Sequence, residues 1–541
     1  MKKYLISILT TIIFGGLYFY IILPPLNITS PSFWFFVLLL LIVYLLTYTI
    51  FCSNEFELVL NSKEINIVRK NKYKKNKITI YKIVGILIPV IIFSILIINF
   101  ILSPIFRADI YKNRITINDK NKFTEDIKEV DFNKIPLLDK DSTQKLGDRK
   151  MGEMPEYVSQ YSVSDLYTQI NYKNEIIRVT PLEYNGFIKY LTNKDEGIKG
   201  YITVDSVKGT SSLIKLDKGI KYTDSAYFNQ DLNRKLRLSY PTKIFGKIVF
   251  ELDEEGEPYF ITPCIKYDGV GIKAEIEGII TLNAITGKTK YYNVKDVPKW
   301  VDRVYSPDLI INQVDDWGNY VNGFLNSIFG QKNVVNTTEG YNYLILNDDV
   351  YLYTGITSVA ADESNLGFIL VNLRTKEANY YNESGAEEFS AMSSAQGLVQ
   401  EKGYVASFPL LINLNSRPTY LLSLKDSAGL VKMYAFVDVE DYQIVSTTES
   451  SLGIKKAAEE YLKKIDKDDT NKKLTEKEIK IKNIKTATID GTSYYYITDT
   501  DNNKYRLSIN VDKYKIPFIE VGDKLNIKYT KSDISIIKDI K

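Results

Sequence analysis

The side chains that could do chemistry in this chain are carboxylates, hydroxyls and lysines, because its 541 residues include no histidine. Ser-His and Cys-His catalysis are therefore excluded, as is any metal site built on imidazole. Four acidic residues lie close together in the sequence: Asp348, Asp349, Asp362 and Glu363. Carboxylates of this kind could ligate calcium or act as an acid pair, but these four lack the spacing of a calcium loop. We expect solvated turn residues, keep a metal site as the alternative, and expect no cofactor.

A second candidate site is a run of alternating tyrosines, formed by Tyr341, Tyr343, Tyr351 and Tyr353. Tyrosines on one face of a strand can form a binding platform for a sugar or a peptide. They can equally pack against a neighbouring strand. We predict packing and keep the binding surface as the alternative.

Nucleophiles are few. Ser393 and Ser394 could form a Ser-Lys dyad, although no S-x-x-K motif in an apolar helix supports one. Cys264 follows a proline inside a predicted strand, which favours a small buried residue over a nucleophile. The segment KGTSS at 208–212 lacks the glycine spacing of a phosphate loop, so we predict a hairpin turn.

The elements that must position these residues follow a membrane anchor. Residues 4–23, 33–52 and 83–106 contain no charged side chain. At about 1.5 Å per residue, each is long enough to cross roughly 30 Å of hydrocarbon. The first segment is longer than the core of a signal peptide and is not followed by a small-x-small cleavage site, so we expect it to remain as an anchor.

The loops between these segments predict the orientation. Loop 24–32 has no charge, whereas loop 53–82 has eight basic and three acidic residues. Short cytoplasmic loops are enriched in Lys and Arg, so we place loop 53–82 and the N-terminus in the cytoplasm and residues 107–541 outside the cell membrane. Topology and the lipid bilayer account for the basic charge, and we expect no nucleic-acid partner.

Beyond the anchor, the patterns predict an α+β fold of antiparallel sheets with packed helices. Residues 200–216 read as a hairpin and residues 165–172 as a helix. Residues 467–478 form a charged linker, and five short alternating segments in 479–541 predict a small β-barrel of the OB or SH3-like type. The two cysteines are not expected to pair, so stability must come from core burial.

An internal similarity organises the middle of the chain. Residues 278–293 align without gaps on residues 367–382, with 7 of 16 positions identical. We therefore expect a repeated structural unit. Its strand-turn-strand segment LNAITGKTKYY resembles the hairpin of PepSY-type domains, which implies small extracytoplasmic modules linked to protease inhibition, envelope signalling and membrane-anchored regulation. In the second copy, Lys376 replaces Gly287 of the first turn.

The expected layout is an anchor (1–106), a stalk with a first α+β domain (107–245), two PepSY-like repeats (246–330 and 331–466), the linker and the barrel. The function we expect is a non-enzymatic scaffold or regulator of the bacterial envelope that binds a protein or a wall polymer. The alternatives are a cell-surface hydrolase using carboxylates or a Ser-Lys pair, and an accessory subunit of a membrane complex. The sequence patterns identify neither the ligand nor the oligomeric state.

Overall fold

The computed structural model describes residues 2–52, 57–61, 64–68, 78–346, 349–359, 364–469, 475–489, 492–509, 511–512, 514–530 and 534–540. Its contacts divide the chain into two compact units. The first comprises Met1–Lys432 with Asp438–Tyr442, and the second comprises Met433–Val437 with Gln443–Lys541.

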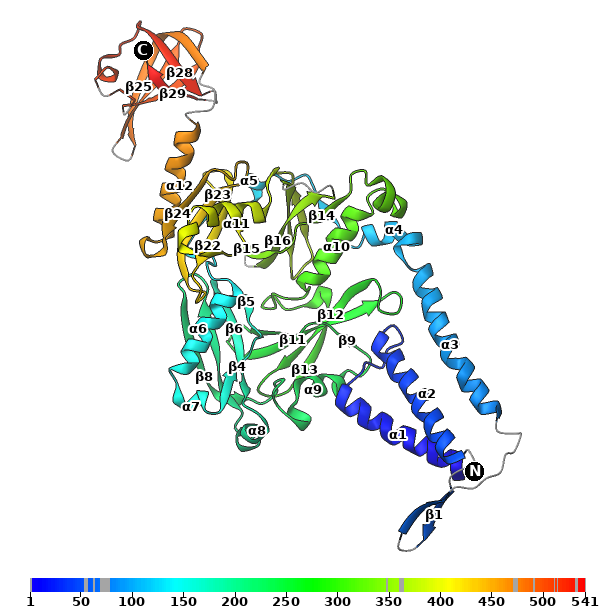
Figure 1. Cartoon of the computed structure of the whole chain (residues 1–541). Coiled ribbons are helices and arrows are strands. Elements are labelled where there is room, and N and C mark those ends of the chain that lie inside the picture. Colours follow the sequence, from blue (N-terminus) through cyan, green and yellow to red (C-terminus); the bar gives the residue numbers. More distant parts are fainter. Residues whose placement is uncertain are drawn as a thin grey trace. The chain divides into compact units, whose positions relative to one another are not determined.

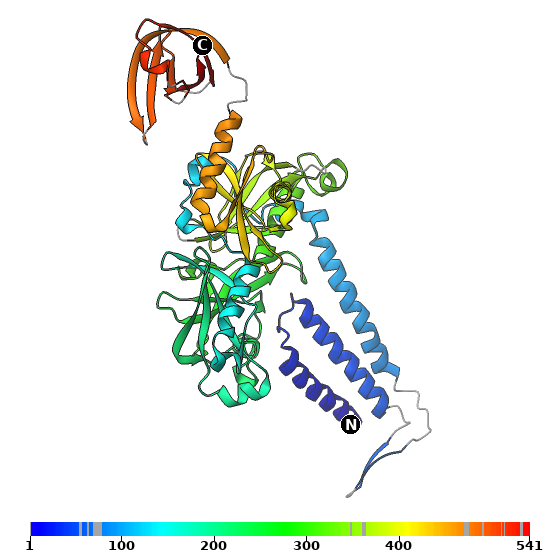
Figure 2. The same ribbon diagram turned by 60° about the vertical axis from the view of Figure 1, so that its left-hand side comes forward.

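The three predicted spans are confirmed as helices long and apolar enough to cross a membrane: α1 (Lys2–Ile22), α2 (Pro31–Cys52) and α3 (Ile78–Ile101). Helices α1 and α2 lie side by side in both views (Figure 1, Figure 2). The described part of the loop between α2 and α3 forms a hairpin of β1 (Glu57–Asn61) and β2 (Glu64–Val68). The third helix ends before the predicted residue 106, because Ser103 and the proline that follows it start a new helix, α4 (Pro104–Lys112).

Hydrogen bonds tie these helices to the soluble part of the first unit. The buried guanidinium of Arg237 donates to the Leu23 carbonyl at the end of α1, at 2.9 Å. The side-chain amide of Asn99 on α3 donates to the Val270 carbonyl and accepts from the Val270 N–H, both at 2.9 Å. The Gly271 N–H donates to the Thr29 carbonyl in the α1–α2 loop at 3.0 Å. That loop and the C-terminal end of α3 therefore contact the same turn, at residues 270–271.

A helix followed by antiparallel strands recurs four times in the first unit (Figure 1). We call these the first to fourth modules. The first contains α6 (Lys140–Gly152), α7 (Pro155–Val158), β4 (Tyr161–Val163), β5 (Thr168–Tyr172), β6 (Glu175–Tyr184), α8 (Phe187–Asn193), β7 (Ile198–Asp205) and β8 (Thr210–Ile220). The second contains the short helix η3 (Phe228–Gln230), α9 (Leu232–Ser239), β9 (Ile244–Phe245), β10 (Val249–Leu252), β11 (Pro258–Tyr267), β12 (Ala274–Asn283) and β13 (Thr289–Asn293).

The third module contains α10 (Pro307–Asn319), β14 (Val335–Thr337), β15 (Asn342–Leu346), β16 (Asp349–Ser358), β17 (Ser364–Asn372) and β18 (Ala378–Tyr381). The fourth contains α11 (Glu388–Gly397), β20 (Val405–Ala406), β21 (Leu410–Leu414) and β22 (Arg417–Lys425), and we count the turn that begins at Asp438 with it. Between α4 and the first module lie β3 (Ile117–Asn118), which pairs with β18, the short helix α5 (Phe123–Asp126) and the turn η2 (Phe132–Lys134).

One kind of turn recurs in all four modules. An Asp or Asn side-chain oxygen accepts the backbone N–H groups two and three residues further on, at 2.8 to 3.1 Å; the residues are Asp205, Asn283, Asn372 and Asp438. The carbonyl of the next residue then accepts one or two N–H groups from the segment just before the module's own helix. Its donors are Leu137 and Leu138 in the first module, Lys221 and Tyr222 in the second, Val304 and Tyr305 in the third, and Ala386 in the fourth. Each module is thereby closed on itself.

The aligned hairpins of the second and third modules have the same register. Ile279 pairs with Tyr292, and Phe368 pairs with Tyr381. Gly287 has φ +70° and Lys376 has φ +68°, so the lysine adopts the left-handed conformation that glycine takes in the first copy.

The hairpin at 200–216 is confirmed as β7 and β8. The helix at 165–172 is wrong: Thr168–Tyr172 form β5, which pairs with β6, and Ile170 is buried in the core. Strand pairing and core packing prevail there over a weak helical pattern.

The second unit contains most of β23 (Val431–Asp438), β24 (Val445–Glu449), α12 (Ile454–Asp469) and a closed five-stranded barrel. The barrel strands are β25 (Thr475–Ile489), β26 (Thr492–Asp499), β27 (Lys504–Ser508), β28 (Lys524–Thr530) and β29 (Ser535–Ile540). Buried isoleucines such as Ile481, Ile497 and Ile527 fill it. The predicted C-terminal β-barrel and the mixed helix-and-sheet fold are confirmed.

The repeated hairpins lead to a stability prediction. A Cβ added at Gly278 would lie 2.3 Å from the Tyr292 carbonyl oxygen, and one at Gly367 would lie 2.3 Å from that of Tyr381. We expect Gly278→Ala and Gly367→Ala each to cost about 1–3 kcal/mol of unfolding free energy, because backbone must move to admit the methyl group. Thermal unfolding of the full chain in lipid nanodiscs would show a lower Tm. Gly397→Ala on α11, where a Cβ meets nothing within 4 Å, should leave Tm unchanged or raised.

Candidate functional site

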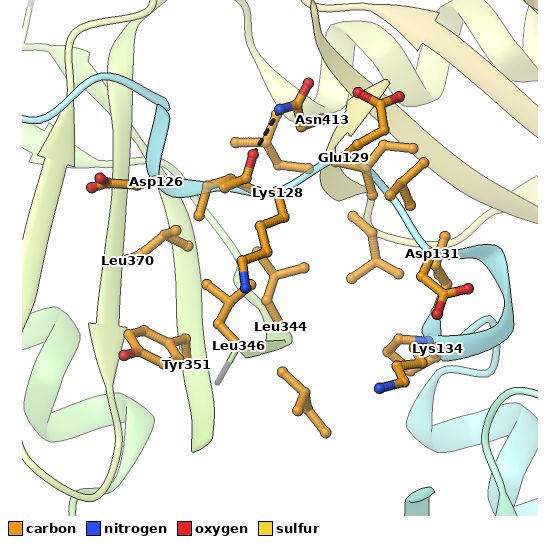
Figure 3. Close-up of a pocket in the computed structure, with 18 of the residues that line it drawn as sticks. Asp126, Lys128, Glu129, Asp131, Lys134, Leu344, Leu346, Tyr351, Leu370 and Asn413 are labelled. Carbon is orange, nitrogen blue, oxygen red and sulfur yellow. Dashed lines mark hydrogen bonds between the residues drawn. The ribbon is translucent and has the colours of Figure 1, made fainter. Parts of the chain in front are cut away.

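A cavity of about 800 Å³ opens in the first unit among the third module, the fourth module and residues 126–136 (Figure 3). One wall consists of apolar side chains from the third module: Leu344, Leu346, Tyr351, Leu370 and Tyr381. The opposite wall is residues 410–413 of β21, and the turn between β5 and β6 completes the lining. Ligand sites are commonly of this size, with apolar walls and a few polar groups.

Strand edges form part of these walls. Among the described strands, β15 pairs only with β16, and β21 pairs only with β22. The Asn342 side chain bridges the two modules by donating to the Phe408 carbonyl at 3.2 Å. Beyond that bridge, residues 344–346 and 410–412 line the cavity. At the far end of β21, the Val130 N–H donates to the Asn413 carbonyl at 2.9 Å.

Within segment 126–136, some charged side chains have hydrogen-bond partners in the protein and others do not. Asp126 accepts a hydrogen bond from the Tyr381 hydroxyl at 3.1 Å, and Glu129 accepts one from the Asn415 N–H at 2.6 Å. Lys128 and Lys134 are exposed, and within the described residues neither makes an ion pair or a side-chain hydrogen bond. In Figure 3, the Lys128 amine extends toward Leu346, whereas the Glu129 carboxylate points the other way. The cations of this segment are therefore available to a ligand.

Two buried carboxylates lie behind the cavity wall. The Asp302 carboxylate accepts the N–H of Asn171, a lining residue, at 2.9 Å. The Glu251 carboxylate on β10 accepts the Asp302 N–H, also at 2.9 Å. Burial raises the pKa of Glu251 to about 7, partly offset by the hydrogen bond from Asp302 and the charge of Arg303. Burial and the Glu251 charge raise the pKa of Asp302.

Unpaired buried donors lie close to this wall as well. The Arg178 Nε and the Gln169 Nε2 are buried without a partner, and both residues line a void of about 20 Å³. A void of that size holds about one water molecule. Burial lowers the pKa of Arg178 to about 10, so its guanidinium stays charged at neutral pH.

The four predicted tyrosines do not form one surface. Register places Tyr343 opposite Leu352, on the other face of the sheet from Tyr351 and Tyr353. Tyr341 and Tyr343 have ring centroids 5.6 Å apart, and the Arg303 guanidinium lies 3.9 Å above the Tyr343 ring. Tyr353 is fully buried and donates to the Glu388 carboxylate at 2.9 Å. Of the four, Tyr351 lines the cavity.

Of the predicted acidic group, only Asp349 falls within the described residues; Asp348, Asp362 and Glu363 lie outside them. Asp349 accepts hydrogen bonds from the Arg374 guanidinium at 2.7 Å and from the Asn372 amide at 2.8 Å. The Asn283 amide donates to Glu257 in the same way in the second module, at 2.9 Å. Asp349 thus orients the recurring turn. The described chain holds no group of three or more Asp, Glu, Cys or His residues placed to bind a metal.

Cys264 is fully buried, and burial raises the pKa of its thiol to about 12. Ser393 and Ser394 lie on α11, and within the described chain neither hydroxyl is hydrogen bonded to a lysine.

Sequence analysis missed Lys128, Lys134, the buried pair Glu251 and Asp302, and the docking residue Asn99. A signal existed for Asn99, because an amide inside an apolar span indicates a specific partner. The lysines gave no comparable signal, since surface lysines are frequent and only the fold brings these two to a cavity.

Comparisons with known proteins provide no family. The sequence matches no family model and no curated protein. Solved structures with partial similarity include a sialidase of Trypanosoma rangeli bound to an inhibitor, at 10% identity over 70% of this chain and 54% of that chain, with a TM-score of 0.16. A polysaccharide lyase is 8% identical over 63% of this chain and 74% of that chain, also with a TM-score of 0.16. Similarity at these TM-scores carries no argument about fold or function.

The buried carboxylates predict a pH-dependent stability. The pKa of about 7 for Glu251 lies above its ordinary value of 4.5, so the folded chain binds more protons between these values than the unfolded chain. Stability should therefore fall as the pH rises through this window. We expect Glu251→Gln to stabilise the chain by about 1–3 kcal/mol near pH 8, with a smaller effect near pH 5. Denaturant unfolding of the full chain at the two pH values measures this difference, and an equal effect at both would contradict it.

Proposed function

We propose that this chain is a membrane-anchored, non-enzymatic binding protein of the bacterial envelope that takes up an extended peptide segment of another protein in its cavity. The single observation that carries this proposal is the cavity of about 800 Å³ between β15 and β21. An edge strand offers unpaired N–H and C=O groups, and an extended peptide can pair with them as an additional strand. A wall polymer would not use these backbone groups in the same way.

The chemistry of the walls narrows the ligand. Apolar side chains at Leu344, Leu346 and Leu370 favour alternate apolar residues in the peptide, because successive side chains of a strand point to opposite faces. Lys128 and Lys134 favour an acidic side chain or a C-terminal carboxylate. The apolar contacts would provide affinity, and the lysines would set the register.

Peptide selection tests this proposal. A phage-displayed library of random peptides is selected on the full chain in nanodiscs, and the enriched peptides are titrated calorimetrically. We expect sequences with alternating apolar residues and at least one carboxylate. Lys128→Glu should weaken their binding about tenfold, since attraction is replaced by repulsion.

The matched control is Lys299→Glu, which reverses the charge of another exposed lysine that lines no described cavity. It should leave the affinity within about twofold of the unchanged chain. Failure to enrich any peptide above empty nanodiscs, or equal binding by the two variants, would argue against the cavity as a peptide site.

The orientation is a separate part of the proposal. We propose that residues 107–541 lie outside the cytoplasm, supported by the basic loop 53–82. In a Cys52→Ala background, Lys332→Cys should react with a membrane-impermeant maleimide in intact cells. Lys72→Cys should react only after the cells are opened. The reverse pattern would place the cavity in the cytoplasm.

A further inference from the structure

An apolar patch lies on the surface of the first and second modules beside the end of α1. It consists of exposed side chains from α8 and from the segment before α9: Phe187, Ile188, Leu191, Tyr227 and Phe228. The Phe187 ring centroid lies 5.0 Å from that of Tyr227 and 6.1 Å from that of Phe228. These rings form one cluster, and Ile188 is 67% exposed beside it. Contiguous exposed apolar surface of this kind indicates a contact with another phase or molecule.

Arg234 fixes this patch next to the membrane-spanning segment. Its guanidinium donates to the Phe228 carbonyl at 2.7 Å and to the Tyr20 carbonyl at 3.3 Å, and it lies 4.2 Å from the Tyr20 ring centroid. Tyr20 belongs to the candidate span Leu5–Ile22. One guanidinium joins the two carbonyls, so the Phe228 backbone lies within several ångströms of a residue inside the span. The interfacial layer on each side of the hydrocarbon is itself roughly 5–8 Å thick.

The backbone supports a specific role for Phe228. Its φ is +54°, a left-handed conformation that a bulky side chain rarely adopts. The surrounding hydrogen bond from Arg234 and the contact with Phe187 hold it there, with the ring 53% exposed. The left-handed backbone and the exposed ring occur at the same residue, which makes Phe228 a candidate for a contact outside the described chain.

We propose that this patch inserts into the outer interface of the lipid bilayer, so that the soluble part contacts the membrane a second time beside α1. Aromatic side chains with an apolar body are favoured at the headgroup level. Lys189 follows Ile188 on α8, and this half-buried lysine is the cation on that helix that could pair with lipid phosphates. The inference is independent of the peptide site, because none of the patch residues lines that cavity.

Fluorescence quenching by brominated lipids tests the insertion. Ile188→Trp is introduced into the full chain, which is reconstituted in nanodiscs of phosphatidylcholine brominated either near the headgroup or deep in the acyl chain. The signal of the native tryptophans is subtracted using the unchanged chain. We expect at least twofold greater quenching than at the control position, and more quenching by the shallow bromines than by the deep ones.

The matched control is Leu398→Trp, at another exposed leucine that caps the C-terminal end of α11. Within the described chain, α11 makes no hydrogen bond with α1 to α3. If Ile188→Trp fails to fold, Tyr227→Trp provides the same measurement. Phe228→Gly, which relieves the left-handed strain and removes the ring, should reduce the quenching at position 188 without lowering Tm. Quenching at position 188 equal to that at position 398 would overturn the proposal and leave the patch to a protein partner.

Discussion

The structure of the soluble part depends on one carbonyl in each module, the one that follows the Asp or Asn of the recurring turn. In the third module, Leu373 offers this carbonyl to the N–H groups of Val304 and Tyr305, at 3.1 and 2.9 Å. The side chain of Asn372 supports this arrangement, because its oxygen accepts the N–H groups of Arg374 and Thr375 and so fixes the turn that presents the Leu373 carbonyl. The end of a hairpin is thus bonded to the start of the helix that covers it. The first strands of each module lie at an edge of its sheet, and the edges at β15 and β21 bound the cavity.

A small set of hydrogen bonds made by Arg237 holds the soluble part at the membrane-spanning helix α1. Arg237 donates to the carbonyls of Leu23, Tyr240, Pro241 and Lys243 and lies 4.1 Å from the Phe245 ring centroid. Burial lowers the pKa of Arg237 to about 10, which still leaves it charged at neutral pH. A buried cation surrounded by carbonyl oxygens is costly to separate from them. Helix α1 and the sheet of the second module should therefore move together rather than as an anchor and a loosely tethered domain.

The features that could be predicted from the sequence are those set by residues close together along the chain. The three spans are set by local composition, and the barrel by local alternation, so both were predictable. The resemblance between residues 278–293 and 367–382 was visible because the turn needs particular side chains, Asn283 and Asn372. The turns at Asp205 and Asp438 were not recognised in the sequence. An aspartate provides the same side-chain oxygen there, but the neighbouring residues do not match those around Asn283 and Asn372. Residues 165–172 were misread because β5 exists only through its pairing with β6.

The cavity escaped prediction for a related reason. It lies between modules, and its lining combines residues 126–136 with segments more than 200 residues further along the chain. No local pattern marks such a junction. Assembling this junction costs free energy at the buried pair Glu251 and Asp302. The Asn171 N–H in the cavity wall donates to the Asp302 carboxylate, and burial disfavours the charged form of that carboxylate. A neutral side chain could satisfy the same N–H at lower cost. Because burial raises the pKa of both carboxylates, the free energy of holding them behind the wall depends on their protonation.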